Sequence, residues 1–165
     1  MKDIINGKVA IKLGDHINAD QMAPPGYMWE RNPEVLARVS LANYDQEFPQ
    51  RVAPGDIIIA GQNFGHGHLH MGGLIGFQRL GISAVIAESI APGWYRGAIA
   101  DGFPVITCSD ITKKVSVGDE LKVNFKTGHI KNLTTGEAIS AEPIPLILRE
   151  IINAGGMAAY VERND

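Results

Sequence analysis

Three short apolar runs, separated by stretches with helical spacing, constrain the fold of this chain more than any other feature. The runs are residues 57–60, 84–87 and 104–107, and turn-forming or polar residues lie between them and the neighbouring elements. Runs of this length, rich in isoleucine and valine, are typical of strands buried on both faces. Apolar residues recur at helical spacing in 74–80 and 94–100, which predicts two intervening helices. This alternating order predicts parallel strands joined by right-handed crossovers.

The segment before this unit predicts one more strand and one more helix. Residues 9–13 alternate weakly between apolar and polar types and end at Gly14, which predicts a first strand. Asn32, Pro33 and Glu34 have the pattern of an N-cap, a proline at the first helical position and an early acid. A helix should therefore begin there. Its inner face is predicted to carry Val35, Leu36, Val39 and Leu41.

The C-terminal third has a different pattern and predicts a hairpin followed by a helix. Residues 120–125 alternate between polar and apolar types, 126–128 form a turn, and 129–133 return as a second strand. A final helix is predicted from about 145 to 153, where Ala154-Gly155-Gly156 ends it. We therefore predict one α/β domain over residues 1–165, whose mixed sheet joins a parallel βαβ core to a C-terminal hairpin.

Composition excludes several classes of function. The formal net charge of −3, with no basic run, argues against a nucleic-acid partner. No apolar run reaches transmembrane length, so we expect no membrane association. Cys108 is the chain's single cysteine, which fits a reducing, cytoplasmic compartment. One thiolate also cannot hold an iron–sulfur cluster, because such clusters need several.

A glycine-rich loop of 61–73 follows the predicted strand of 57–60, at the sheet edge where α/β proteins bind ligands. It contains three of the chain's five histidines, His66, His68 and His70. In an extended segment these alternate side chains share one face, so they are candidates for a metal site. Acid–base chemistry is a second interpretation, because imidazole titrates near neutral pH. In the third interpretation they are polar loop residues that bond to nearby backbone.

Several motifs match one known family, and together they span nearly the whole chain. They are Asp15-His16-Ile17-Asn18-Ala19-Asp20, similar to the family's Asp-Asn-Ile-Asp/Thr-Thr-Asp; Gly61-Gln62-Asn63-Phe64-Gly65, similar to Gly-Glu-Asn-Phe-Gly; the hairpin motif of 131–136; and Ala154-Gly155-Gly156. The chain thereby resembles the aconitase superfamily, and more closely the separate small subunit of 3-isopropylmalate dehydratase. This resemblance implies a swivelling β/β/α domain.

The resemblance also implies an activity and a partner. Members of the family reversibly dehydrate and hydrate small hydroxy-acids, here in leucine biosynthesis. A large subunit carries a [4Fe–4S] cluster, and the small subunit supplies a base and substrate contacts. We therefore expect no cofactor in this chain, a cluster-bearing large subunit as its partner, and a hydro-lyase activity that requires both.

The resemblance assigns roles to residues, although the active loop departs from the family's Gly-Cys-Gly-Ser-Ser-Arg-Glu-His. His68 stands at the position of the catalytic serine, and the acid at Asp20 is retained, so both are candidate catalytic residues. His70 replaces a carboxylate-binding arginine, which loses a permanent forked cation and favours a substrate with fewer carboxylates than isopropylmalate. The candidate substrate-binding residues are His66, His70, Tyr27, Arg31 and Asn63.

Two alternatives to a hydro-lyase subunit are left open by the sequence. The chain could be a non-catalytic or regulatory partner that kept the fold and lost the site. It could also be a stand-alone protein that binds a metal through its loop histidines.

Overall fold

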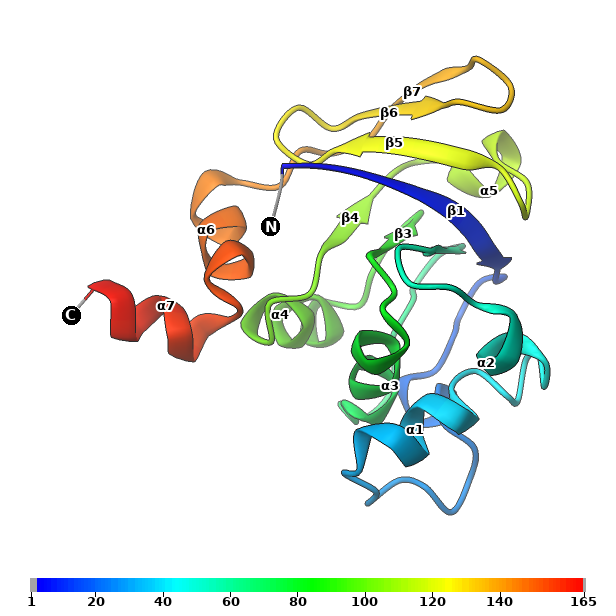
Figure 1. Cartoon of the computed structure of the whole chain (residues 1–165), viewed down its shortest axis with the longest axis vertical. Helices are drawn as coiled ribbons and strands as arrows, with labels where there is room; N and C mark the ends of the chain where they lie inside the picture. Colours follow the sequence, from blue (N-terminus) through cyan, green and yellow to red (C-terminus); the bar gives the residue numbers. More distant parts are fainter. Residues whose placement is uncertain (1–2, 165) are drawn as a thin grey trace.

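The structure is a computed structural model that describes residues 3–164. Its strands are β1 (Ile4–Lys12), β2 (Ile57–Ala60), β3 (Ala84–Ala87), β4 (Val105–Thr107), β5 (Glu120–Asn124), β6 (His129–Asn132) and β7 (Ala138–Ser140). Its helices are the short 3-10 helix η1 (Ala19–Gln21), α1 (Pro33–Val39), α2 (Phe48–Arg51), α3 (Gly72–Leu80), α4 (Pro92–Ala100), α5 (Ile111–Lys114), α6 (Leu146–Ala154) and α7 (Met157–Asn164). The strands form one sheet in the order β4-β3-β2-β1-β5-β6-β7, and Figure 1 shows α1, α3 and α4 on one side of it.

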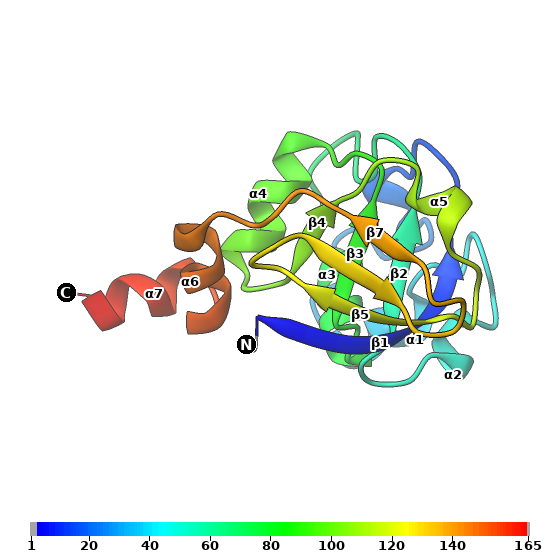
Figure 2. The same ribbon diagram turned by 90° about the horizontal axis from the view of Figure 1, so that it is seen from above.

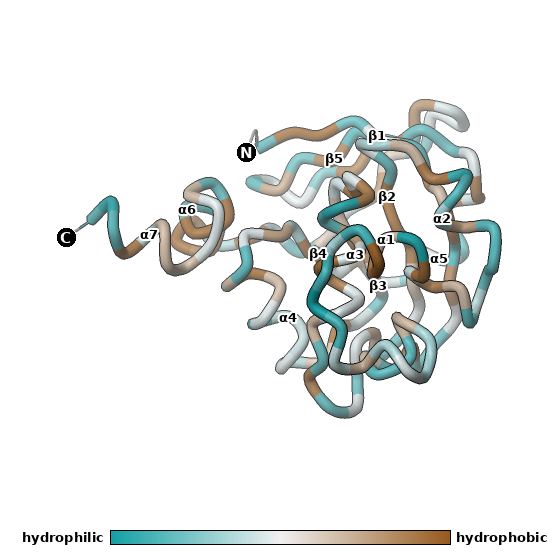
Figure 3. Tube along the Cα trace, turned by 60° about the horizontal axis from the view of Figure 1, so that its bottom comes forward, coloured by the Kyte–Doolittle hydropathy of each residue, from teal (hydrophilic) through white to brown (hydrophobic). Residues whose placement is uncertain are grey.

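The parallel half of the sheet confirms the predicted strand–helix alternation. β1, β2, β3 and β4 are parallel neighbours, and α3 and α4 connect β2 to β3 and β3 to β4. Every residue of β2 and β3 is buried, and Figure 3 shows both strands as hydrophobic segments. This complete burial explains why their sequences are continuously apolar rather than alternating.

β1 belongs to both halves of the sheet and is longer than the sequence predicted. Residues 4–8 pair antiparallel with β5, whereas the part from Val9 onward pairs parallel with β2. The prediction of a strand confined to 9–13 was wrong at its start. The N-terminal part has one solvent-facing side, with Ile4 exposed, so its sequence lacks the continuous apolar run that marks the other strands.

The C-terminal region confirms the predicted hairpin and adds two elements that the sequence did not predict. β5 and β6 form the hairpin, and the short β7 extends it to three antiparallel strands. Gly155 and Gly156 end α6 as predicted, but α7 begins at the next residue, so α6 is not the last helix. α7 has no buried residue, which leaves little apolar periodicity to mark it. Figures 1 and 2 show α6 and α7 beside α4, at the side of the molecule away from α1 and α2.

The helices before and between the strands follow their local sequence signals. Asn32 caps α1 by accepting the amide of Glu34 (3.0 Å), as the sequence predicted. Leu36 is fully buried, and Leu41 is buried too, although it lies beyond the end of α1. α2 and α5 are four residues each, which is too short for a periodic signal. None of the helices within residues 3–164 has the length and hydrophobicity needed to cross a membrane.

Candidate active site

The segments that follow β1 and β2 run side by side at the carboxyl edge of the parallel half-sheet. Backbone hydrogen bonds continue the pairing of the two strands past their ends, and an isolated parallel bridge joins Asn18 to His66. The bonds run from the amide of Gly61 to the carbonyl of Gly14 (3.1 Å), from His16 to Gln62 (2.7 Å), from Gly65 to Ile17 (2.8 Å) and from Ala19 to His66 (2.8 Å). The motif of residues 15–20 and the glycine-rich loop of 61–73 therefore form one structural unit.

Asp20 lies at the centre of this unit, between two histidines of the glycine-rich loop. The side chain of Asn18 caps η1 by accepting the amide of Asp20 (2.8 Å), which fixes the backbone at the acid. Nδ1 of His68 lies 3.4 Å from Oδ2 of Asp20, and Nε2 of His70 lies 3.3 Å from Oδ1. The side chain of His68 is 87% exposed, whereas those of Asp20 and His70 are 23% and 21% exposed. The structure thus brings together the two candidate catalytic residues and one candidate binding residue.

His66 faces away from this carboxylate and belongs to a second cluster. Its Nε2 donates to the carbonyl of His16 (2.9 Å), and its ring meets the ring of His16 edge-on with centroids 6.1 Å apart. Asn63 donates from Nδ2 to Nδ1 of His16 (3.3 Å), so it lies in the same cluster. The sequence did not predict a separate role for His16, which was noted only as part of the motif of residues 15–20.

This arrangement bears on the metal-site interpretation of the three loop histidines. His66 bonds to a backbone carbonyl, while His68 and His70 face Asp20. Within residues 3–164 no group of three histidine, cysteine, aspartate or glutamate side chains could share a metal ion. In the described chain His66 is therefore separated from His68 and His70, because the loop turns at Gly67, where φ is +88°, rather than remaining extended.

The loop of residues 24–31 reaches the site through Trp29. The indole of Trp29 meets the ring of His70 edge-on, with centroids 5.8 Å apart, and it is 76% exposed. Arg31, a predicted substrate-binding residue, instead donates to the carbonyls of Met28 (3.4 Å) and Glu30 (2.8 Å) in its own loop. Tyr27 is half-buried at the start of this turn, and its amide donates to the carbonyl of Pro24. Trp29 was not among the predicted site residues, although it lies two positions after Tyr27 in the same loop.

A buried aromatic pair supports the glycine-rich loop from below. Trp94 of α4 is 1% exposed and meets Phe64 edge-on, with ring centroids 4.9 Å apart. Gly65 lies directly against this indole at a φ of +79°, and a Cβ there would be 2.4 Å from Cγ of Trp94. Only glycine satisfies both the left-handed backbone and the close approach. The side chain of Ser89 also accepts the amide of Asn63 (2.7 Å), which ties the loop to the end of β3.

Two cavities lie beside the strands of the parallel half-sheet. One, of about 360 Å³, opens at the carboxyl ends of β2, β3 and β4 and is lined by Gln62, Glu88, Ser89, Ser109 and Asp110. The Lys113 ammonium bonded to Asp110 holds the pKa of that carboxyl below its ordinary value.

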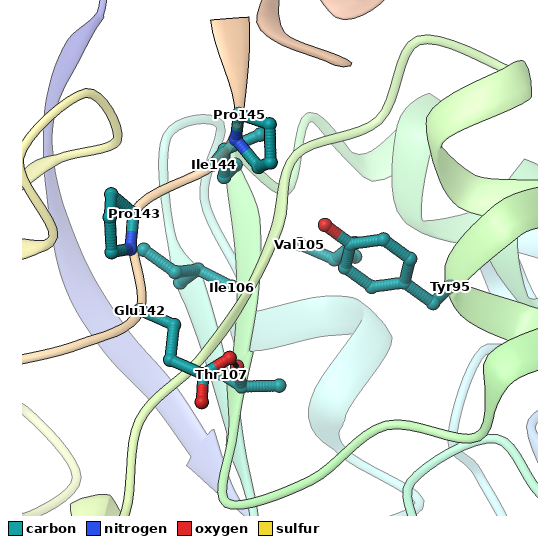
Figure 4. A pocket seen from close by; sticks show the side chains of 8 residues that line it. All are labelled: Tyr95, Val105, Ile106, Thr107, Glu142, Pro143, Ile144 and Pro145. Atoms are coloured by element: carbon teal, nitrogen blue, oxygen red, sulfur yellow. Dashed lines mark hydrogen bonds between the residues drawn. The ribbon is translucent and has the colours of Figure 1, made fainter.

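The other cavity, of about 280 Å³, lies between α4, β4 and residues 142–145, and Figure 4 shows the side chains that line it. Burial, together with the charge of Glu142, raises the pKa of the Tyr95 hydroxyl in this cavity. Thr107 donates to the carboxylate of Glu142 (2.9 Å) across it. None of the predicted site residues lines this second cavity.

Comparisons with known proteins relate the whole chain to one group of enzyme subunits. No family model matches the chain. It is 44% identical over 163 residues to the isopropylmalate/citramalate isomerase small subunit of Methanocaldococcus jannaschii, covering 99% of this chain and 96% of that one. It is 39% identical over 158 residues to the 3-isopropylmalate dehydratase small subunit of Ruminiclostridium cellulolyticum, covering 96% of each chain. The crystal structure of 3-isopropylmalate dehydratase from Methanocaldococcus jannaschii matches with a TM-score of 0.90 at 34% identity, covering 98% of this chain and 95% of that one.

Proposed function

The chain belongs to the family of 3-isopropylmalate dehydratase small subunits, and we propose that it completes the active site of a hydro-lyase whose large subunit binds the cluster and the substrate. The match over nearly the full length of the relatives supports a small-subunit fold. The reaction is the reversible dehydration and hydration of a small hydroxy-acid. The observation that carries the proposal is the contact between Asp20 and His68 on the loops where the family motifs lie.

The [4Fe–4S] cluster expected for this family does not fit the residues of this chain. Cys108 is the only cysteine, and it is buried against Ser140 rather than facing the histidine loop. A cluster of this type is held by several thiolates. The cluster therefore belongs to the large subunit in our proposal, and this chain contributes side chains that bind substrate and move a proton. The single thiol also supports a cytoplasmic location.

His68 is the proposed proton acceptor. When Nδ1 of His68 carries the proton that faces Asp20, the lone pair on Nε2 is free to accept a proton from a substrate carbon. The carboxylate of Asp20 orients the ring and stabilises the imidazolium that forms. The high exposure of the His68 side chain makes it accessible to a substrate held by a partner subunit. In the hydration direction the same ring returns the proton.

We further propose that the substrate has an apolar substituent and fewer carboxylates than isopropylmalate. His70 stands where the family has a forked cation, and it faces Asp20. Arg31 is bonded to its own loop. In contrast, the loops that carry the site expose large apolar side chains: Met28 (41%), Trp29 (76%) and Leu69 (53%). Exposed apolar surface of this kind is suited to a hydrocarbon group rather than a second carboxylate. Tyr27, His66 and Asn63 remain proposed binding residues.

The test is reconstitution with a cluster-bearing large subunit, followed by turnover assays on a series of hydroxy-acids. We expect turnover to require both subunits, and His68→Ala to lower it at least ~100-fold, the usual contribution of a general base. Co-elution of the His68→Ala chain with the large subunit would show that assembly survives. The control is His129→Ala, which removes an exposed histidine on β6 and should leave turnover unchanged.

Two results would contradict this proposal. Full turnover by the His68→Ala complex would exclude His68 as the base. Full turnover by the large subunit alone would instead support a non-catalytic partner role for this chain.

A further inference from the structure

The two carboxylate oxygens of Asp20, Oδ1 and Oδ2, have different surroundings. Oδ2 faces the exposed ring of His68, whereas Oδ1 is buried and makes no hydrogen bond of good geometry. Nε2 of His70 lies 3.3 Å from that buried oxygen. A carboxylate oxygen removed from water is costly unless a donor satisfies it. His70 is therefore placed to supply the missing donor once the contact tightens, as contacts in open active sites do on closure.

The surroundings of His70 restrict its ring to this contact. Its backbone amide donates to the carbonyl of His68 (2.9 Å), so a tight turn fixes the two histidines relative to one another. Their ring centroids are 6.3 Å apart. The indole of Trp29 covers one side of the His70 ring, and the side chain is only 21% exposed. His70 is thus enclosed between a carboxylate and an aromatic ring, whereas His68 projects outward.

We infer that His70 is a positioning residue for the proposed base, rather than a substrate contact. It donates Nε2–H to Oδ1 of Asp20, and this leaves Oδ2 directed at Nδ1–H of His68. His68 is then held in the tautomer whose Nε2 is unprotonated and faces outward. Trp29 keeps the His70 ring in place by edge-on packing. This inference rests on the proposed function, because it assigns His70 a role relative to His68 and Asp20.

The first test uses the isolated full-length chain and needs neither partner nor substrate. Long-range ¹H–¹⁵N correlation spectra report which ring nitrogen of each histidine carries the proton at a pH where the rings are neutral. We expect His68 to be mainly in the Nδ1–H form, which is the minor neutral form of an unrestrained histidine side chain in water. Asp20→Ala should lower the ratio of Nδ1–H to Nε2–H by roughly fivefold, the effect of one ordinary hydrogen bond.

The variants of His70 separate positioning from a general structural effect. His70→Ala should lower the same ratio by roughly twofold, because the carboxylate loses its second support. His70→Gln retains an N–H donor at the reach of Nε2 and should restore the wild-type ratio. His129→Ala is the control and should leave the spectrum of His68 unchanged. A wild-type ratio in His70→Ala, with a well-dispersed spectrum, would overturn the inference.

The second test uses the complex with the large subunit and divides the effect between kcat and KM. Loss of a positioning residue should lower kcat of His70→Ala about tenfold with KM nearly unchanged, and His70→Gln should recover most of it. A raised KM at unchanged kcat would make His70 a substrate contact and overturn the inference. Absence of turnover in the wild-type complex with every hydroxy-acid would count against the proposed function alone, because the tautomer measurement on the isolated chain does not depend on it.

Discussion

Replacement of Gly65 by alanine tests how the glycine-rich loop of residues 61–73 is supported. The new Cβ would lie 2.4 Å from Cγ and 2.6 Å from Cβ of Trp94. Carbon atoms pack at about 3.5–4.0 Å, so the loop and the indole must separate by roughly 1 Å. Trp94 is 1% exposed and is packed against Phe64, which is fully buried, so neither ring has open space to move into.

The cost of Gly65→Ala follows from two separate terms. Placing a side chain at a φ of +79° costs about 1–2 kcal/mol. Overpacking a filled core by one methyl group costs about 1–3 kcal/mol. Together they lower the free energy of unfolding by about 3 kcal/mol, and with a urea m-value of about 2 kcal/mol/M the midpoint falls by about 1.5 M. Circular dichroism in a urea series measures this shift.

The matched control is Gly93→Ala on the same helix as Trp94. A Cβ at Gly93 meets no atom within 4 Å, and alanine is the better helix former, so the midpoint should stay or rise slightly. In the reconstituted complex, Gly65→Ala should also lower turnover, because His68 lies three residues along the displaced loop. Equal urea midpoints for the two variants would refute the idea that Trp94 is a fixed support for the loop.

Two further predictions concern buried groups away from the site. Burial raises the pKa of the Cys108 thiol, so a thiol reagent at pH 8 should label native protein far more slowly than urea-unfolded protein. Since the unfolded thiol ionises first, stability should fall as pH rises above the thiol's ordinary range, and Cys108→Ala should remove that part of the alkaline loss. Asn132 donates to the buried carboxylate of Asp119 (2.8 Å); Asn132→Ala should lower the free energy of unfolding by about 2 kcal/mol, because the acid loses a donor. An unchanged urea midpoint would contradict this account of the hairpin.

The parts of the fold that the sequence predicted are those where burial dictates residue type. β2 and β3 are buried on both faces, and only apolar side chains of suitable shape fit there. Helix α1 was predicted from its cap, because Asn32 and Pro33 have local roles that do not depend on the rest of the chain. β7, α5 and α7 were missed because their three- or four-residue length, or their lack of buried residues, leaves no periodic pattern.

The candidate site shows the same division between local and long-range information. That Asp20 and His68 lie together was implied by the family resemblance of their two motifs. The separation of His66 from the other loop histidines did not follow, because it depends on a turn at Gly67, where φ is +88°. The contact of Trp29 with His70 joins residues far apart in sequence, and no local rule predicts the path of that polar loop.

The way in which the two loops pair makes the side-chain tests interpretable. β1 and β2 are parallel neighbours, and their pairing continues through the amide of Leu13 to Ile59 and on to the bridge between Asn18 and His66. Backbone hydrogen bonds, rather than the side chains of the proposed catalytic residues, therefore set the distance between the loops. Removing the imidazole of His68 or the carboxylate of Asp20 should leave that framework in place. Loss of turnover in those variants would then report on proton transfer, whereas loss in Gly65→Ala would report on the framework itself.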